Sequence, residues 1–482
     1  MRFPRFIPLL LPVLTLALLC RQPAAAYSVL THEQLIDLTW QDSIVPLLLS
    51  RYPNLTPFQL EQARAYAYGG CVIQDMGYYP FGDLFYSDLT HYVRSGDFVV
   101  SLFRNAHNAD ELAFAVGALS HYIGDSVGHS DATNLAVPVE FPKLRRRYGP
   151  VVSYEQGQHQ HVQTEFAFDI DELAHHHMAP LGYLRHVGFK VPVHQLALAF
   201  YQTYGITDFA GYHASRFNMR EYRYAVRTFI PRVAFAVAVL HRRHEPAEPD
   251  TPDTVEIDKE IAAVAVANHW DRYRHKTSFE TYALACFLFV LPKVGPLALV
   301  NVKGPTEQTE ADYMHSLVLS TQSLRLSLHR FTPPAKSTAS ADPVSPAPNH
   351  AAAPGTSAQP APAAPLPVDT HREGAQPAID PRHPLPNRDL DTGHVIQPGG
   401  YSLTDSTYAS LLHRLTRTPQ QPVPPGIVRD IQAYYADPDA PITTKRDPKR
   451  WAQVEVDLKT LATMPTNPEP QPYPTYEQAA AQ

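Results

Sequence analysis

Three residues that can bind a metal ion follow one another at steps of four between His121 and His129. The segment reads His121-Tyr-Ile-Gly-Asp125-Ser-Val-Gly-His129. In an α-helix four residues turn roughly 400°, so the three side chains project from nearly the same face. Imidazole and carboxylate groups are Zn²⁺ ligands, and the two oxygens of a central Asp125 can bridge two ions. The alternative interpretation is a solvated polar face that binds no metal.

Further residues of the same chemical types occupy positions from which they can join such a site. His161 and Glu165 stand four residues apart, which places an imidazole and a carboxylate one helical turn apart. His159 competes with His161 for this role but lacks the four-residue step to Glu165. Asp75 and His91 lie in an aromatic, turn-rich segment, residues 71–95, that we expect to be an irregular loop able to orient side chains freely.

The beginning of the chain has the pattern of a secretory signal peptide. Two basic residues, Arg2 and Arg5, precede an apolar run, and Ala24-Ala25-Ala26 precedes Tyr27. This pattern predicts cleavage after residue 26 and a secreted or periplasmic protein that begins at Tyr27. The new α-amino group would then stand five residues before His32, where it can itself bind a metal ion.

Charge and cysteine content exclude several classes of protein. The formal net charge is −7, from 40 basic and 47 acidic residues, so we expect no nucleic-acid partner. Beyond the predicted leader only Cys71 and Cys286 remain, which rules out a disulfide-rich framework or a four-cysteine zinc site. These two cysteines either form one disulfide or stay free.

The hydrophobic pattern predicts an all-α fold. Helix-start signals stand at Thr31, at Thr56-Pro57 and at Asn108, and we expect helices from Thr31 to about Trp40, from Pro57 to Tyr68 and from Asn108 through His129. Alternating patterns typical of strands are absent from the sequence. Residues 281–300 are strongly apolar, but their uninterrupted part is too short to span a bilayer, so we expect a buried helix there.

Composition divides the chain into segments. Residues 332–390 are rich in proline and alanine. Such a composition cannot form a core, so this stretch is predicted to be a disordered linker. Aromatic and aliphatic residues return after it. The predicted segments are a signal peptide (1–26), a catalytic domain (27–244), an additional helical region packed on it (245–331), the linker (332–390) and a small C-terminal helical module (391–482).

Taken together, these motifs resemble the zinc-dependent phospholipase C family, which is related to the S1/P1 nucleases. The resemblance covers the motifs between Tyr27 and Phe166 and implies an all-helical domain with up to three Zn²⁺ ions. It implies one ion on Asp75, His91, His121 and a bridging Asp125, a second on the Tyr27 terminus, His32 and Asp125, and a third on His129, His161 and Glu165.

The resemblance also implies a reaction. Zinc lowers the pKa of a bound water toward ~7 and can polarise a phosphoryl oxygen, as phosphodiester hydrolysis requires. The expected activity is phospholipase C: cleavage of a phospholipid, free or in a membrane surface, to diacylglycerol and a phosphorylated head group, with Asp75 as general base. Met76 stands where choline-specific members carry tyrosine, so choline specificity is not implied. The alternatives are an S1/P1-type single-strand nuclease and a metal-stabilised binding protein without catalysis.

Overall fold

The computed structural model describes residues 28–79, 82–206, 214–241, 248–274, 278–290, 302, 304–331, 384–436 and 446–468. All of the regular elements in these ranges are helices, which confirms the predicted all-α fold. The predicted signal peptide, Tyr27 and residues 332–383 of the predicted linker lie outside the described residues. The helices are α2 (Val29–Thr39), α3 (Val45–Arg51), α4 (Pro57–Gly70), α5 (Leu84–Tyr92), α6 (Ser95–Arg104), α7 (Ala109–Gly128), α8 (Asn134–Glu140), α9 (Pro142–Tyr148), α10 (Gln158–Ala174), α11 (Leu181–Val187), α12 (Val193–Tyr204), α13 (Ala214–Tyr224), α14 (Ile230–His241), α15 (Pro252–Ala267), α16 (Phe279–Val290), α17 (Glu307–Phe331), α18 (Ser402–Thr416), α19 (Pro425–Ala436) and α21 (Pro448–Leu461).

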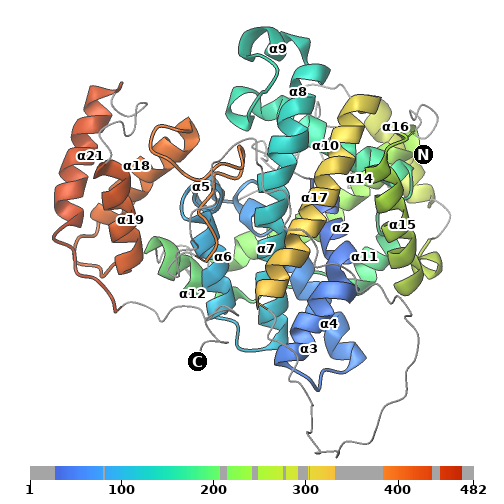
Figure 1. The fold of residues 1–482 in the computed structure, drawn as a ribbon, viewed down its shortest axis with the longest axis horizontal. Coiled ribbons are helices and arrows are strands. Elements are labelled where there is room, and N and C mark those ends of the chain that lie inside the picture. The colour runs from blue at the N-terminus through green and yellow to red at the C-terminus, as the bar shows by residue number, and fades with distance from the viewer. Residues whose placement is uncertain are drawn as a thin grey trace, which may run out of the picture.

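Helix α7 lies in the middle of the molecule and packs against α4, α6 and α17 (Figure 1). Two glycines allow α4 and α7 to approach closely. A Cβ atom on Gly70 would lie 2.1 Å from the Phe114 carbonyl oxygen, and one on Gly117 would lie 2.2 Å from the Ala67 carbonyl oxygen. Because neither position tolerates a side chain, this close approach depends on glycine at both.

Two of the three predicted helix starts are confirmed. Thr56 forms a reciprocal capping box with Gln59 at the start of α4, and the Asn108 side chain accepts a hydrogen bond from the Glu111 N–H at the start of α7. The start at Thr31 is wrong, because α2 begins at Val29. Thr31 instead donates from its hydroxyl to Asp169 on α10, so a tertiary contact replaces the predicted local cap.

The predicted irregular loop between residues 71 and 95 is also partly wrong. It contains a short 3₁₀ helix, Gln74–Gly77, and then α5, whose first turn is capped by the Asp83 side chain accepting from the Phe85 N–H. His91 therefore lies in the last turn of a helix, and Asp75 lies in the 3₁₀ turn before it.

The additional helical region packs on the domain through α17. Tyr313 of α17 stacks on Phe168 of α10 with ring centroids 4.6 Å apart, and its hydroxyl lies 2.9 Å from the Thr31 hydroxyl. Further along α17, Arg325 donates to both oxygens of Glu260 on α15. These contacts join α17 to α2, α10 and α15.

Residues 384–390 do not belong to the linker as predicted. Leu385 and Leu390 are buried in the main hydrophobic core, and the Leu390 N–H donates to the His91 carbonyl oxygen. The part of the chain that packs on the domain therefore includes residues 384–390. It continues into the predicted small helical module, in which α18 packs on α5 and α19 on α12 (orange and red in Figure 1).

Helix α16 departs from the expected buried helix. Ala285 and Leu288 pack inward, but Phe279, Phe289 and Val290 are 78%, 72% and 80% exposed. Among the helices that the structure describes, none combines the length and apolar character needed to cross a membrane. Cys286 of this helix is exposed and Cys71 is buried, and both are free thiols.

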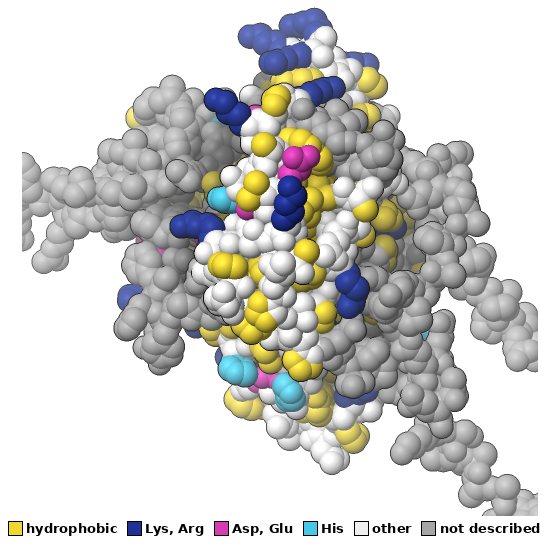
Figure 2. Space-filling model, turned by 90° about the vertical axis from the view of Figure 1, so that its left-hand side faces the viewer, with side chains coloured by type: hydrophobic (Ala, Val, Ile, Leu, Met, Phe, Trp, Pro, Cys, Tyr) yellow, Lys and Arg dark blue, Asp and Glu magenta, His cyan; other side chains and the backbone are white. Residues whose placement is uncertain are grey.

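Helix α9 carries an exposed basic cluster made of Lys143, Arg145, Arg146 and Arg147. Figure 2 shows Lys and Arg side chains gathered at the top of one face, at the height of α9 in Figure 1. The basic side chains seen there point into solvent.

Candidate metal centre

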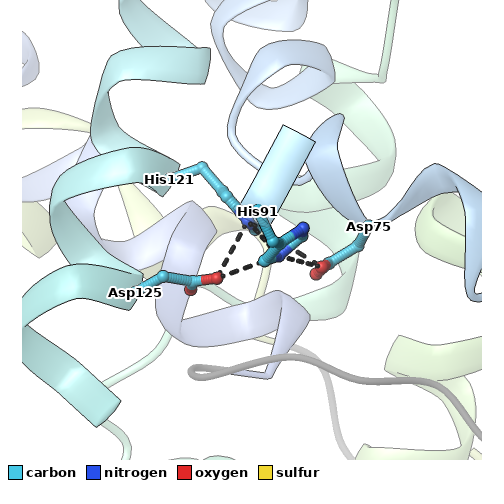
Figure 3. A group of neighbouring side chains, drawn as sticks. All are labelled: Asp75, His91, His121 and Asp125. Atoms are coloured by element: carbon cyan, nitrogen blue, oxygen red, sulfur yellow. Dashed lines mark hydrogen bonds and ion pairs between the residues drawn. The ribbon is translucent and has the colours of Figure 1, made fainter. Parts of the chain in front are cut away.

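Asp75, His91, His121 and Asp125 converge in the interior of the molecule (Figure 3). One donor atom from each lies within 4.8 Å of all the others, and all four side chains are buried. They come from the 3₁₀ turn, from α5 and from two successive turns of α7. The structure thus brings together the four residues that the family resemblance assigned to one ion.

Both histidines of this cluster are held by their Nδ1 atoms. His91 Nδ1 donates to the Ser87 carbonyl oxygen at 2.8 Å, and His121 Nδ1 donates to the Cys71 carbonyl oxygen at 3.0 Å. The Nε2 atoms then face each other at 3.4 Å. In neutral imidazoles these Nε2 atoms carry lone pairs, so a cation between them would hold both, and backbone hydrogen bonds at Nδ1 are typical of metal-binding histidines.

The two oxygens of Asp125 face different histidines. Oδ2 lies 3.1 Å from His121 Nε2 and 3.3 Å from His91 Nε2, whereas Oδ1 lies 3.2 Å from His32 Nε2. This is the arrangement that a bridging carboxylate needs. The third component of the expected second ion, the Tyr27 terminus, lies outside the described residues.

His129, His161 and Glu165 form a second cluster. His129 opens a π-helical turn directly after α7, and the other two lie one turn apart on α10. His161 Nε2 donates to Asn134 Oδ1 at 2.8 Å, and its Nδ1 lies 2.9 Å from Glu165 Oε1. His159, the competing candidate, is only partly buried and is not a member of this cluster.

Several buried atoms of the two clusters have no hydrogen-bond partner. They are both carboxylate oxygens of Asp75, both of Asp125, Nε2 of His129 and Oε2 of Glu165. Leaving so many buried polar atoms unpaired is costly, and metal ions would satisfy all of them. Oxygen and imidazole nitrogen donors of this kind fit Zn²⁺.

The electrostatics keep the central carboxylate ionised. Burial by itself raises the pKa of Asp125, but the surrounding imidazoles, His121 above all, hold the pKa well below its ordinary value. Burial raises the pKa of Glu165 to about 8. Burial lowers the pKa of His129, but Glu165 and Asp391 outweigh it and raise the pKa to about 9.

Sequence reasoning missed the residues that hold the second cluster in place. His129 Nδ1 donates to the Leu390 carbonyl oxygen at 2.8 Å, and Asn134 Nδ2 donates to the Asp391 carbonyl oxygen at 2.8 Å. The Asp391 carboxylate accepts from the hydroxyls of Tyr92 and Tyr401. The only signal in the sequence is the turn-forming segment Asp389-Leu-Asp-Thr-Gly393, which follows the proline-rich stretch.

The comparisons with known proteins bear on this centre. Residues 31–214 match the family model described as zinc-dependent phospholipase C. The matched range contains each described candidate ligand and ends before α15 and α17. No curated protein and no solved structure gave a significant match.

Proposed function

We propose that the protein is a secreted zinc metallohydrolase that cleaves phospholipids at the glycerol-side phosphate ester. The proposal is supported by the match of residues 31–214 to the zinc-dependent phospholipase C family model. The products are diacylglycerol and a phosphorylated head group. The family supports a phospholipase C-type hydrolase. Secretion is inferred from the leader pattern at residues 1–26.

One observation carries the proposal: the Nε2 atoms of His91 and His121 face each other at 3.4 Å with Asp75 and Asp125 around them. Each histidine is locked by Nδ1 to a backbone carbonyl. The donor atoms are therefore fixed before any ion binds, which limits the cost of assembling the centre.

Asp75, His91, His121 and Asp125 would hold one ion, Asp125 and His32 another, and His129, His161 and Glu165 a third. When bound, zinc supplies Lewis acidity toward a phosphoryl oxygen and lowers the pKa of a coordinated water. Asp75 Oδ2 is buried without a hydrogen-bond partner, which suits it to accept the proton of the attacking water. A bond then forms between the water oxygen and phosphorus, and the bond from phosphorus to the glycerol oxygen breaks. The glycerol oxygen takes up a proton from solvent water, so diacylglycerol leaves as an alcohol, and Asp75 returns its proton to solvent.

The test compares substrates on the same zinc-loaded protein. Liposomes of single phospholipids, with choline, ethanolamine, serine or glycerol head groups, are incubated with the protein, and both products are measured by mass spectrometry. We expect cleavage that stops after chelation and returns with zinc. Single-stranded DNA, incubated in parallel, should stay intact, and its digestion with intact liposomes would favour the nuclease alternative.

A matched pair of variants connects cleavage to the centre. Asp125→Ala removes the bridging carboxylate and should lower activity by more than about 100-fold. Glu256→Ala removes an exposed carboxylate on α15 and should leave activity unchanged. Equal activity in the two variants would contradict the proposal.

The burial of the centre favours one second candidate, a metal-stabilised binding protein without catalysis. Asp75, His91, His121, Asp125 and His129 are all no more than 1% exposed, and closed sites are typical of structural zinc. This candidate predicts that chelation unfolds the protein while the metal-loaded form cleaves none of the four lipids and no DNA.

A further inference from the structure

A separate cluster of metal-ligand side chains lies at the C-terminal end of α10, away from His161 and Glu165 in its first turns. Asp171 lies in the last turn of α10, His175 directly follows this helix, and Glu310 lies in the first turn of α17. One donor atom from each of the three lies within 4.8 Å of the other two. We propose that these three residues bind a divalent cation, Zn²⁺, which fastens α17 to α10.

The donor atoms are buried and lack hydrogen bonds. Glu310 is 1% exposed, and neither of its carboxylate oxygens has a hydrogen-bond partner. Asp171 Oδ2 and His175 Nδ1 lie at ion-pair distance, 3.3 Å, but neither atom makes a hydrogen bond. Buried carboxylates without hydrogen bonds are costly, and a cation between these atoms would satisfy them together.

The end of α10 explains how His175 reaches this position. The His177 N–H donates to the Glu172 carbonyl oxygen, and the His176 N–H donates to the Leu173 carbonyl oxygen. His176 has φ 67°, the left-handed conformation that ends a helix in this hydrogen-bond pattern. The chain therefore stops at a fixed point, with His175 Nδ1 directed at Asp171.

The charges favour a cation over an ordinary ion pair. One protonated histidine balances one carboxylate, as His315 and Asp253 do at 2.9 Å between α17 and α15. Here His175 faces Asp171 at 3.3 Å and Glu248 at 3.8 Å, and Glu310 adds a further carboxylate to the cluster. A divalent ion matches two carboxylates and a neutral imidazole.

The donor set selects among cations. Calcium and magnesium prefer sites made entirely of oxygen, whereas zinc accepts imidazole nitrogen together with carboxylate oxygen. The neighbouring group of His177, Glu248 and Asp258 has the same residue types. We assign no ion to that group, because the Asp258 side chain is 43% exposed and 3.0 Å from His177 Nε2, as in a solvated ion pair.

The location gives the cation a role distinct from catalysis. Glu310 lies outside the range 31–214 that matches the family, whereas Asp171 and His175 lie inside it. An ion held by all three would tie the additional helical region to the domain. It would therefore contribute to stability and not to the reaction.

The experiment counts zinc in the full chain. Purified protein is passed through gel filtration at a fixed free zinc concentration, and bound zinc per chain is measured by mass spectrometry. We expect Glu310→Gln and His175→Gln each to hold one equivalent less than the parent. The zinc-dependent rise in Tm should shrink by on the order of 5 °C, and the rate of phospholipid cleavage should not change.

His315→Gln is the matched control. It removes the ion pair between His315 on α17 and Asp253 on α15, and neither residue belongs to the Asp171, His175 and Glu310 cluster. It should keep the parent's zinc content. If Glu310→Gln does not fold, His175→Gln, at the more exposed end of the site, gives the same answer. Unchanged zinc content in His175→Gln would overturn the proposal. If His175→Gln loses one equivalent of zinc while the parent protein cleaves no lipid, the cation site is supported and only the proposed function is contradicted.

Discussion

The imidazole of His129 donates from Nδ1 to the carbonyl oxygen of Leu390 at 2.8 Å, although 261 residues separate the two. This hydrogen bond leaves Nε2 facing Glu165. It also makes the C-terminal segment part of the support of the candidate metal centre.

Asp391 should control metal retention at the His129 cluster. Its carboxylate is held by the Tyr92 and Tyr401 hydroxyls, at 2.9 and 2.7 Å, and this fixes the turn that contacts His129. We expect Asp391→Ala to weaken zinc binding there by about 10–100-fold, the usual cost of losing a supporting residue. Competition with a chelator measures this, and Glu455→Ala, an exposed carboxylate on α21, should behave as the parent.

Zinc binding at this cluster should release protons. Without metal, the pKa of His129 is about 9 and that of Glu165 about 8, so both groups hold protons at pH 7. Both must lose them to bind zinc, and affinity should therefore rise as the pH rises toward 9 and fall toward acid pH. Calorimetry at pH 7 in two buffers of different ionisation enthalpy counts the protons; heats that do not depend on the buffer would contradict the prediction.

Gly70→Ala should destabilise the fold. The new methyl group would lie 2.1 Å from the Phe114 carbonyl oxygen, which forces α4 and α7 apart. We expect a loss of about 1–3 kcal/mol in the free energy of unfolding, as for other overpacked cores. Urea unfolding measures it, with Glu256→Ala, a surface change on α15, expected within about 0.5 kcal/mol of the parent. Equal stabilities would show that the two helices can separate at no cost.

Asp169→Ala should loosen the start of α2. The carboxylate accepts from the Leu30 N–H and the Thr31 N–H, each at 3.1 Å, and from the Thr31 hydroxyl at 2.7 Å. Removing it leaves the two buried N–H groups unpaired, at about 1–3 kcal/mol for each group left without a partner, whereas the Thr31 hydroxyl keeps the Tyr313 hydroxyl 2.9 Å away. Hydrogen exchange at Leu30 and Thr31 should accelerate more than at Leu60 in α4, and equal acceleration would indicate global unfolding instead.

Local sequence alone predicted much of the helical structure. The Thr56 and Asn108 caps, the helices that make up the regular structure of the described ranges, and the four-residue steps from His121 to Asp125 and from His161 to Glu165 all depend on hydrogen bonds within one or two turns. Such features are fixed by neighbours in the chain, so a pattern of residue types is enough to find them. The match over residues 31–214 agrees with what those motifs implied.

Tertiary structure decided the rest, because the deciding contacts join residues that are distant in sequence. Thr31 is a partner of Asp169 instead of a helix cap, and Leu385 and Leu390 are buried in the core instead of continuing the linker. The hydrogen bond from His129 to Leu390 and the proximity of Asp171 to Glu310 are also contacts between residues distant in the sequence. Such pairs form only when whole helices pack to bury their apolar faces. The pattern of residue types along the chain does not show which distant atoms will then be in contact.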